Sequence, residues 1–179
     1  MNQNNLELKH FCSDFTKIRK VLLEIGAEKE SAKTQKDYFF ELSKSKKGNP
    51  KLKLRIENKK QTLIYYDRPE FKKGIETPSK IKLYLIKDEQ LLPFLSESLG
   101  VKSVVKKTRE IWRKDNTVFH LDNVKTVGKI FEIELQKNGR INQEDREIFK
   151  NYQDKLLPFL GKIIKGSNAD LVKNKKYSK

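Results

Sequence analysis

The chain has 179 residues and a formal net charge of +16, because 40 lysine and arginine residues outnumber 24 aspartate and glutamate residues. A single cysteine, Cys12, excludes an internal disulfide and a cysteine-rich zinc site, and the lack of any run of about eighteen apolar residues excludes a membrane-spanning helix. We expect one domain over residues 1–179 and, because no apolar signal segment opens the chain, a cytoplasmic protein.

Apolar periodicity predicts eight strands and three or four helices. In chain order they are a strand at about 4–12, a helix at 14–25, strands at 32–42, 51–58, 61–67 and 80–87, a helix at 88–99, strands at 101–113, 116–124 and 129–137, a helix at 143–157, and a small helix around 169–172 within a lysine-rich segment that begins near 161.

Several boundaries of these elements have a specific signal. Ser13 is a suitable N-cap for the first helix, and Gly26 is a suitable residue to end it. Pro93 predicts a break or a late start in the second helix, which ends at Gly100. The pair Asp115-Asn116 predicts a tight hairpin turn.

Strict alternation gives several strands one apolar face and one charged face. Phe131-Glu132-Ile133-Glu134-Leu135 alternates in this way, as do Asn5–Lys9 and Lys51–Glu57. Because a parallel sheet would bury both faces, we predict an α+β protein with an antiparallel sheet and flanking helices. The charged face is either solvated or folded into the lumen of a closed barrel.

The charged faces carry both signs. Their carboxylates are Glu7, Glu57, Asp122, Glu132 and Glu134, and their cations are Lys9, Lys53, Arg55, Lys107 and Arg109. Carboxylates suit a hard divalent cation, and lysine with arginine suits phosphate oxygens, so convergence of these faces predicts a site for a metal and a polyphosphate. Glu57 is expected to pair with a neighbouring lysine, and His120 to orient Asp122 rather than to bind metal.

The net charge predicts an anionic partner without identifying it. A nucleotide, inorganic polyphosphate, nucleic acid and an anionic membrane surface are all left open. A codon bias toward lysine and asparagine is an alternative explanation for part of the excess charge.

Short segments along the chain carry recognisable motifs in a fixed order. They are Asn5-Leu6-Glu7-Leu8-Lys9, Gln35–Phe40, Leu54-Arg55-Ile56, Leu63–Pro69, Val104–Trp112, His120–Val124 and Val127–Glu134. Together they resemble the CYTH superfamily of class IV adenylyl cyclases and thiamine triphosphatases over nearly the whole chain. The fourth and fifth segments are similar to the cyclase-type branch in particular.

This resemblance implies an antiparallel eight-stranded closed barrel, or triphosphate tunnel, that is commonly dimeric and binds a triphosphate with Mg²⁺ or Mn²⁺. The metal ligands implied by the resemblance are Glu7, Asp122, Glu132 and Glu134. The implied substrate-binding residues are Lys9, Lys53, Arg55, Lys80, Lys82, Lys107 and Arg109, although the segment around Lys80 and Lys82 matches the family poorly. The implied catalytic residues are Glu132, Glu134, Lys107 and Arg109.

Two positions depart from the family pattern. Asn5 replaces the first glutamate of E-x-E-x-K, which removes a negative charge, and Val118 stands where the cyclase-like branch often has arginine.

The resemblance implies an adenylyl cyclase that converts ATP to cyclic AMP and pyrophosphate, acting as a homodimer without a membrane partner. The first alternative is a triphosphatase acting on thiamine triphosphate, a nucleoside triphosphate or tripolyphosphate. The second is a non-catalytic binder of nucleotide, polyphosphate or RNA ends, although a nucleic-acid partner is not favoured.

Overall fold

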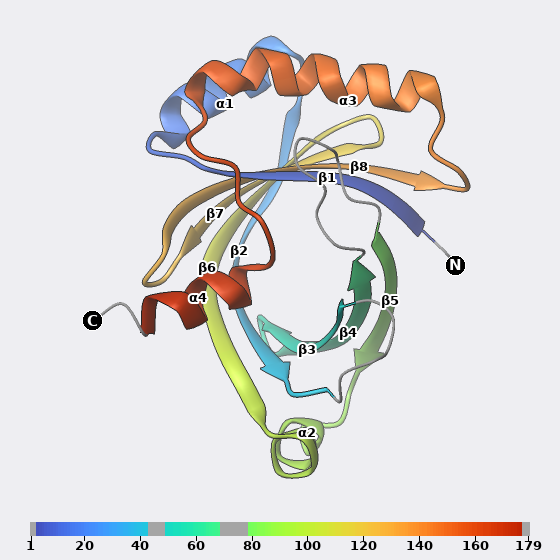
Figure 1. The fold of residues 1–179 in the computed structure, drawn as a ribbon, viewed down its shortest axis with the longest axis vertical. Coiled ribbons are helices and arrows are strands. Elements are labelled where there is room, and N and C mark those ends of the chain that lie inside the picture. The colour runs from blue at the N-terminus through green and yellow to red at the C-terminus, as the bar shows by residue number, and fades with distance from the viewer. Residues whose placement is uncertain (1–2, 43–48, 69–78, 177–179) are drawn as a thin grey trace.

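The computed structural model describes residues 3–42, 49–68 and 79–176, which form one curled antiparallel sheet with helices around it (Figure 1). The strands are β1 (Gln3–Phe11), β2 (Glu28–Phe40), β3 (Asn49–Glu57), β4 (Lys60–Arg68), β5 (Ser79–Ile86), β6 (Val101–Lys114), β7 (Thr117–Val124) and β8 (Gly128–Asn138). The helices are α1 (Phe15–Glu24), α2 (Leu91–Leu99), α3 (Gln143–Leu156) and α4 (Asn168–Lys176), with a short 3₁₀ turn, η1 (Leu157–Phe159), after α3.

The eight predicted strands are confirmed, and all their pairings are antiparallel, in the spatial order β1-β5-β4-β3-β2-β6-β7-β8 with β8 beside β1. β1 and β8 pair along their length, from Gln3↔Asn138 to Phe11↔Ile130. β1 and β5 meet only at Asn4↔Lys80 and Asn5↔Ser79.

The sheet is therefore a curled half-barrel that stays open along most of its β1–β5 edge, and the prediction of a closed barrel is correct only in part. The reason is that another segment occupies the far end of the β1 edge. Phe11 N–H donates to Lys162 O at 3.0 Å, Gly161 N–H to Phe11 O at 2.8 Å, and Ile164 N–H to Lys9 O at 2.8 Å. We call residues 161–164 the strap.

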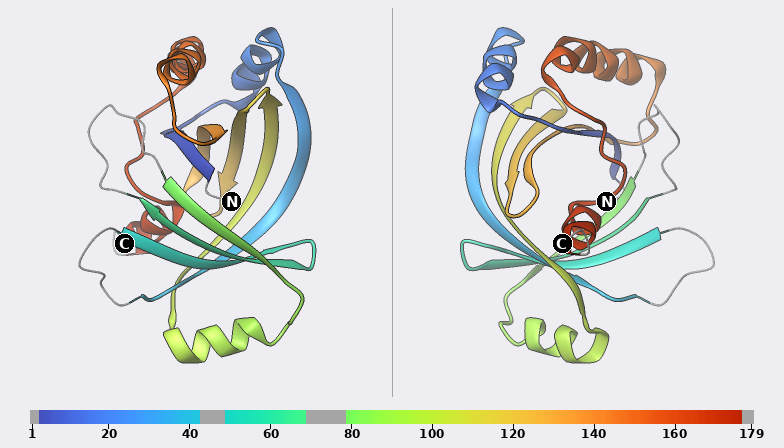
Figure 2. Two further views of the ribbon diagram at one scale, coloured as in Figure 1. Left: turned by 90° about the vertical axis from the view of Figure 1, so that its right-hand side faces the viewer. Right: turned by 60° about the vertical axis from the view of Figure 1, so that its left-hand side comes forward.

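The main hydrophobic core lies outside the curled sheet, under α1 and α3, which cover the outer face of β1, β7 and β8 (Figures 1 and 2). Its strand residues are Leu6, Leu8, Trp112, Phe119, Leu121, Phe131, Ile133 and Leu135. Because side chains alternate along a strand, burying this apolar face outward turns the charged face inward. The alternative of a solvated charged face is thus excluded for these strands.

The boundaries of the first two helices follow their sequence signals with one correction. The N-cap of α1 is Asp14, not Ser13, because the Asp14 carboxylate accepts from Thr16 N–H at 2.8 Å. Gly26 has a φ of 77° just after the helix, as a terminating glycine requires. The late start predicted from Pro93 is confirmed, since α2 begins at Leu91 and holds the proline in its first turn.

The hairpin turn predicted at Asp115-Asn116 is confirmed. β6 and β7 are joined by the two-residue turn Asp115-Asn116, and Asp115 has a φ of 49°. Cys12 is buried and free. The sequence Lys44-Ser45-Lys46-Lys47, which predicts a lysine-rich turn between two strands, lies outside the described residues. In the described part of the chain, no helix is both long and apolar enough to cross a membrane.

A capping box begins α3 and gives a first testable prediction. The Asn142 side chain accepts from Asp145 N–H at 2.9 Å, and the Asp145 carboxylate accepts from Asn142 N–H at 2.7 Å. Replacing Asn142 with alanine is expected to lower the free energy of unfolding by about 1 kcal/mol. Urea denaturation followed by circular dichroism measures this, and Gln143→Ala, on the exposed face, should change stability by less than about 0.5 kcal/mol.

The strap leads into α4, which lies against one mouth of the curled sheet (Figure 1). Ile164 and Ala169 are buried there in a second apolar cluster, with Val105, Val124 and Ile130 from the inner face of the sheet. On the other side of this mouth, Asp170 pairs with Lys51 of β3 at 3.1 Å. The small helix predicted around residues 169–172 therefore covers one end of the lumen.

Candidate functional site: a charged cavity inside the curled sheet

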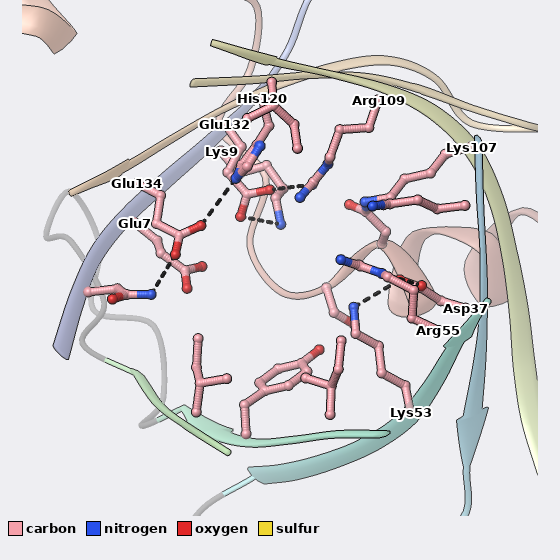
Figure 3. Close-up of a pocket in the computed structure, with 18 of the residues that line it drawn as sticks. Glu7, Lys9, Asp37, Lys53, Arg55, Lys107, Arg109, His120, Glu132 and Glu134 are labelled. Carbon is pink, nitrogen blue, oxygen red and sulfur yellow. Dashed lines mark hydrogen bonds and ion pairs between the residues drawn. The ribbon is translucent and has the colours of Figure 1, made fainter. Parts of the chain in front are cut away.

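A cavity of about 310 Å³ lies within the curled sheet and receives side chains from all eight strands (Figure 3). Its polar lining comprises Asn5, Glu7, Lys9, Lys33, Gln35, Asp37, Lys53, Arg55, Glu57, Lys107, Arg109, His120, Glu132, Glu134, Gln136, Ser167 and Asn168. β4 and β5 contribute an apolar wall of Ile64, Tyr66, Ile81 and Leu83. The charged faces of the alternating strands therefore converge on one cavity, which is the condition on which the expected metal and polyphosphate site depends.

Three glutamates from β1 and β8 form one wall of the cavity. Glu7 is directly opposite Glu134 in the β1–β8 register, and Lys9 is opposite Glu132. Glu132 is held by two cations, with Lys9 Nζ at 3.2 Å and an Arg109 guanidinium nitrogen at 3.1 Å. The acidic wall is thus joined to the basic side of the cavity through Glu132.

Glu134, in contrast, contacts neutral donors. Asn5 Nδ2 donates to it at 2.5 Å, Gln136 Nε2 donates at 3.1 Å, and His120 Nε2 lies 3.2 Å away. Burial is the largest influence and raises the pKa of Glu134, but the contacts with His120 and Gln136 together more than offset it, so the pKa stays below its ordinary value. Glu134 is therefore an ionised carboxylate without a permanent cation among these three partners.

Two residues on this wall differ from expectation. His120 contacts Glu134 rather than Asp122, so the prediction that it orients Asp122 is wrong. Burial and the nearby Arg109 lower the pKa of His120, which favours the neutral ring that donates through Nε2. Asn5, which replaces a family glutamate, uses its amide to bind Glu134, a contact that a second carboxylate would not make.

The first basic cluster is built on Asp122. Its fully buried carboxylate accepts from Lys107 Nζ at 2.8 Å and from Arg109 at 2.5 and 2.6 Å, and Asn168 Nδ2 lies 3.3 Å away. Burial raises the pKa of Asp122, but the Arg109 and Lys107 charges more than offset it and hold the pKa well below its usual range. Asp122 lies behind the cations, which themselves line the cavity.

The second basic cluster is built on Asp37 of β2. Its carboxylate accepts from Lys53 Nζ at 2.8 Å and from Arg55 at 2.7 and 2.9 Å. The Lys53 ammonium also lies 5.3 Å from the Phe39 ring centre and 5.9 Å from that of Tyr66, within range of cation–π attraction. Figure 3 shows both clusters pointing into the same cavity.

Burial makes two of these lysines unusually acidic. Burial, followed by the Arg55 charge, lowers the pKa of Lys53 to about 7. Burial, followed by the Arg109 charge, lowers the pKa of Lys107 to about 8. A polyphosphate bound between them would favour their charged forms and would not need to displace water from exposed ammonium groups.

The remaining residues singled out from the sequence differ in where they lie. Glu57 pairs with Lys33 at 2.9 Å, as expected for an ion pair. Lys82 is exposed, whereas its neighbours Ile81 and Leu83 line the cavity, so strand alternation places Lys82 on the outer face and away from the cavity. The side chain of Lys80 lies outside the described residues. Val118 is buried opposite Glu134 and supplies no cation.

The donor chemistry fits Mg²⁺ or Mn²⁺, because Glu7, Glu132 and Glu134 are hard oxygen donors at neighbouring inward positions. Among the described residues, no three acidic, histidine or cysteine side chains are already gathered to hold a metal ion. Glu132 would exchange a contact with Lys9 or Arg109 for the metal, whereas Glu134 would exchange only contacts with neutral groups.

The comparisons with known proteins agree with this fold. The structure is similar to the PH1012 protein of Pyrococcus horikoshii (23% identity, TM-score 0.75, 93% of this chain and 98% of that one). It is also similar to a candidate adenylate cyclase of Vibrio parahaemolyticus (14% identity, TM-score 0.71, 97% of this chain and 99% of that one). A third similar structure is a candidate adenylyl cyclase of Hippeastrum with a dominant triphosphatase activity (13% identity, TM-score 0.65, 97% of this chain and 96% of that one).

At these identities the structural likeness concerns the fold alone. No curated protein sequence matches the chain. The family model of the CYTH domain, however, matches residues 3–167, which is most of the chain. The chain therefore belongs to the CYTH domain family.

Proposed function

We propose that this protein is a metal-dependent enzyme that acts on a triphosphate bound in the cavity, and that its first candidate reaction converts ATP to cyclic AMP and pyrophosphate. The observation that supports this proposal is the pairing of two buried basic clusters, on Asp37 and Asp122, with a wall of glutamates across the same cavity. Phosphoryl and nucleotidyl transfer depend chiefly on positioning and on neutralising phosphate charge.

In this proposal the basic residues bind the phosphate chain. Arg55, Lys107 and Arg109 face the cavity with their side chains fixed by buried carboxylates, so little conformational entropy is lost when phosphate binds. Lys53 and Lys9 add further positive charge. Asp122, with cations on both of its oxygens, positions Lys107 and Arg109 in this account rather than holding metal.

Mg²⁺ or Mn²⁺ would be held by Glu132 and Glu134, with Glu7 beside them. When bound, such an ion neutralises charge on the phosphate oxygens and lowers the pKa of the attacking hydroxyl group or water. His120 and Asn5 keep the Glu134 carboxylate in place, and the neutral state of His120 avoids adding a positive charge that would compete with the metal.

In the cyclase reaction, a ribose hydroxyl oxygen of ATP forms the new bond to the α-phosphorus. The bond from that phosphorus to the oxygen of pyrophosphate breaks, and the hydroxyl proton passes to solvent. Lys107, Arg109 and Arg55 would stabilise the departing pyrophosphate. The apolar wall on β4 and β5 offers a surface for the base and ribose of a nucleotide.

Hydrolysis of a terminal phosphate is the second candidate, since the Hippeastrum relative in fold has a dominant triphosphatase activity. In that reaction a water oxygen bonds to the terminal phosphorus, and the shortened phosphate chain leaves. The same basic clusters would serve both reactions, because the choice depends on which phosphorus lies beside the glutamates.

Product analysis separates these candidates. The purified protein is incubated with ATP, and separately with tripolyphosphate, in the presence of Mg²⁺ or Mn²⁺, and the products are resolved by mass spectrometry. Cyclic AMP with pyrophosphate supports the cyclase, and orthophosphate without a cyclic product supports the triphosphatase. No metal-dependent product from either compound would contradict both and favour a non-catalytic binder.

Binding without metal should depend on pH. In the protein without bound phosphate, the pKa of Lys53 is about 7 and that of Lys107 is about 8, so both lysines lose their protons as the pH rises through this range. Affinity for tripolyphosphate in the presence of a chelator should therefore fall by about tenfold between pH 7 and pH 9. Calorimetric titration at several pH values measures this affinity. Lys53→Met should weaken binding at pH 7 and flatten the dependence of affinity on pH. If that dependence is unchanged in the variant, Lys53 is not one of the phosphate-binding cations.

A further inference from the structure

The helix at the mouth of the lumen contacts the basic machinery through one side chain. Asn168, the first residue of α4, is buried to more than nine-tenths and lines the cavity. Its Nδ2 donates to Asp122 Oδ2 at 3.3 Å, and this is the oxygen that also accepts from Lys107 and from Arg109. Asn168 thus adds a donor from outside the strands to a carboxylate that fixes two phosphate-facing cations.

The position of Asn168 is itself set by three attachments of α4. Before the helix, the strap is hydrogen-bonded to the edge of β1. At the start of the helix, Ser167 N–H and Oγ both donate to Asp170, at 2.9 and 2.7 Å, and Asp170 also pairs with Lys51. Ala169 is buried in the apolar cluster at this end of the lumen. The amide is therefore held against Asp122 by elements on both sides of the cavity.

The contacts of Asp122 favour a positioning role for Asn168. The Asp122 carboxylate must satisfy an arginine and a lysine that approach from the same strand, β6, and small rotations of the carboxylate would favour one cation over the other. A neutral donor to Oδ2 from a separate element, α4, restricts that rotation without adding a further positive charge. At 3.3 Å this contact is longer than those of the two cations, at 2.5 to 2.8 Å, so it bears on the orientation of the carboxylate more than on its charge.

We propose that Asn168 is a positioning residue that orients Asp122, and through it Lys107 and Arg109, so that docking of α4 sets the affinity of the cavity for the phosphate chain. This inference rests on the proposed function, because it concerns the same phosphate-binding cations. Asn168 has no part in the chemical step. Its loss should weaken phosphate binding while leaving the fold and the glutamate wall intact.

The test compares Asn168→Leu with the unaltered protein. The leucine side chain is similar in size but has no donor for Asp122. Isothermal titration calorimetry with tripolyphosphate, in a chelator that removes divalent metals, is expected to give an approximately tenfold higher Kd for Asn168→Leu. Melting temperatures recorded for both proteins show whether the variant remains folded.

Ser167→Ala is the comparison variant, because Ser167 immediately precedes α4 and lines the cavity, but its Oγ donates to Asp170 instead of Asp122. The backbone N–H of residue 167 still donates to Asp170 in this variant, so the attachment that positions Asn168 is kept. Its Kd should stay within about twofold of the unaltered value. A double variant tests the route of the effect: in an Asp122→Asn background, Asn168→Leu should change the Kd by less than about twofold, since the carboxylate it acts on is gone.

Each outcome has a distinct meaning. If the unaltered protein binds tripolyphosphate and Asn168→Leu binds it equally well, the inference about Asn168 is wrong and the proposed function stands. If Ser167→Ala weakens binding as much as Asn168→Leu, the effect comes from general packing of α4, which also overturns the inference. If the unaltered protein binds neither tripolyphosphate nor ATP, the proposed function itself fails, and the inference with it.

Discussion

Replacing Glu134 with glutamine is expected to lower metal-dependent turnover by about a thousandfold, or roughly 4 kcal/mol in transition-state stabilisation. Glu134 is an ionised, buried carboxylate that contacts Asn5, Gln136 and His120, all neutral groups, so its charge is directed at whatever positive species enters the cavity. Glutamine keeps the shape of the side chain and can still contact these neighbours, but it supplies no negative charge.

The measurement is kcat with ATP and with tripolyphosphate at saturating Mn²⁺, alongside the melting temperature. Glu57→Gln is the matched control, because Glu57 also faces the cavity but is already paired with Lys33 at 2.9 Å. We expect less than about a threefold change in kcat for that variant. Retention of more than a tenth of the original turnover by Glu134→Gln would contradict the assignment of Glu134 as a metal ligand.

Replacing Asp122 with alanine is expected to have the largest effect on stability, lowering the free energy of unfolding by about 3–5 kcal/mol. The carboxylate is fully buried and satisfies Lys107 and Arg109. Its removal takes from Lys107 the carboxylate at 2.8 Å and leaves Arg109 with the longer contact to Glu132 at 3.1 Å. Buried charges that have lost their counter-charge are far more costly than an apolar substitution at the same place.

Urea denaturation at pH 7 measures this loss. Asp170→Ala, which removes a much more exposed carboxylate paired with Lys51, is the comparison and should cost about 1 kcal/mol or less. Because the pKa of Asp122 is lower in the folded than in the unfolded protein, its contribution is present above pH 4 and is lost as the pH falls further. Below pH 4, the free energy of unfolding should therefore fall less steeply with pH in Asp122→Ala than in the unaltered protein. Equal free energies of unfolding of the two proteins at pH 7 would contradict the account.

The strands were predictable because their apolar and charged residues alternate so regularly. In β8, Phe131, Ile133 and Leu135 face the outer core, while Glu132 and Glu134 face the cavity. Helix ends were predictable to within a residue, because a capping side chain or a terminating glycine acts locally. Gly26 ends α1 as predicted, and the N-cap is Asp14 rather than the adjacent Ser13. The incomplete closure was not predictable, because it depends on the strap, which comes from residues more than a hundred positions after β1.

Site residues were predictable where alternation along one strand decides which way the side chain faces. They were less predictable where their role depends on contacts with other elements. Asp37 lies within the Gln35–Phe40 motif but was not predicted as a site residue, because its role depends on a register that places it opposite Arg55. Lys82 was placed in the site by resemblance alone, and strand alternation puts it outside. Asn168 carries no local signal, because its contact with Asp122 exists only once α4 has docked.

The central claim is that the cavity binds a triphosphate between the basic clusters and a metal beside the glutamates. A crystal structure of the protein with Mn²⁺ and a non-hydrolysable ATP analogue, with anomalous data collected at the manganese edge, tests it most directly. We expect phosphate density against Arg55, Lys107 and Arg109, and an anomalous peak beside Glu132 and Glu134. A phosphate chain bound elsewhere on this strongly basic protein, with no manganese peak in the cavity, would contradict the account.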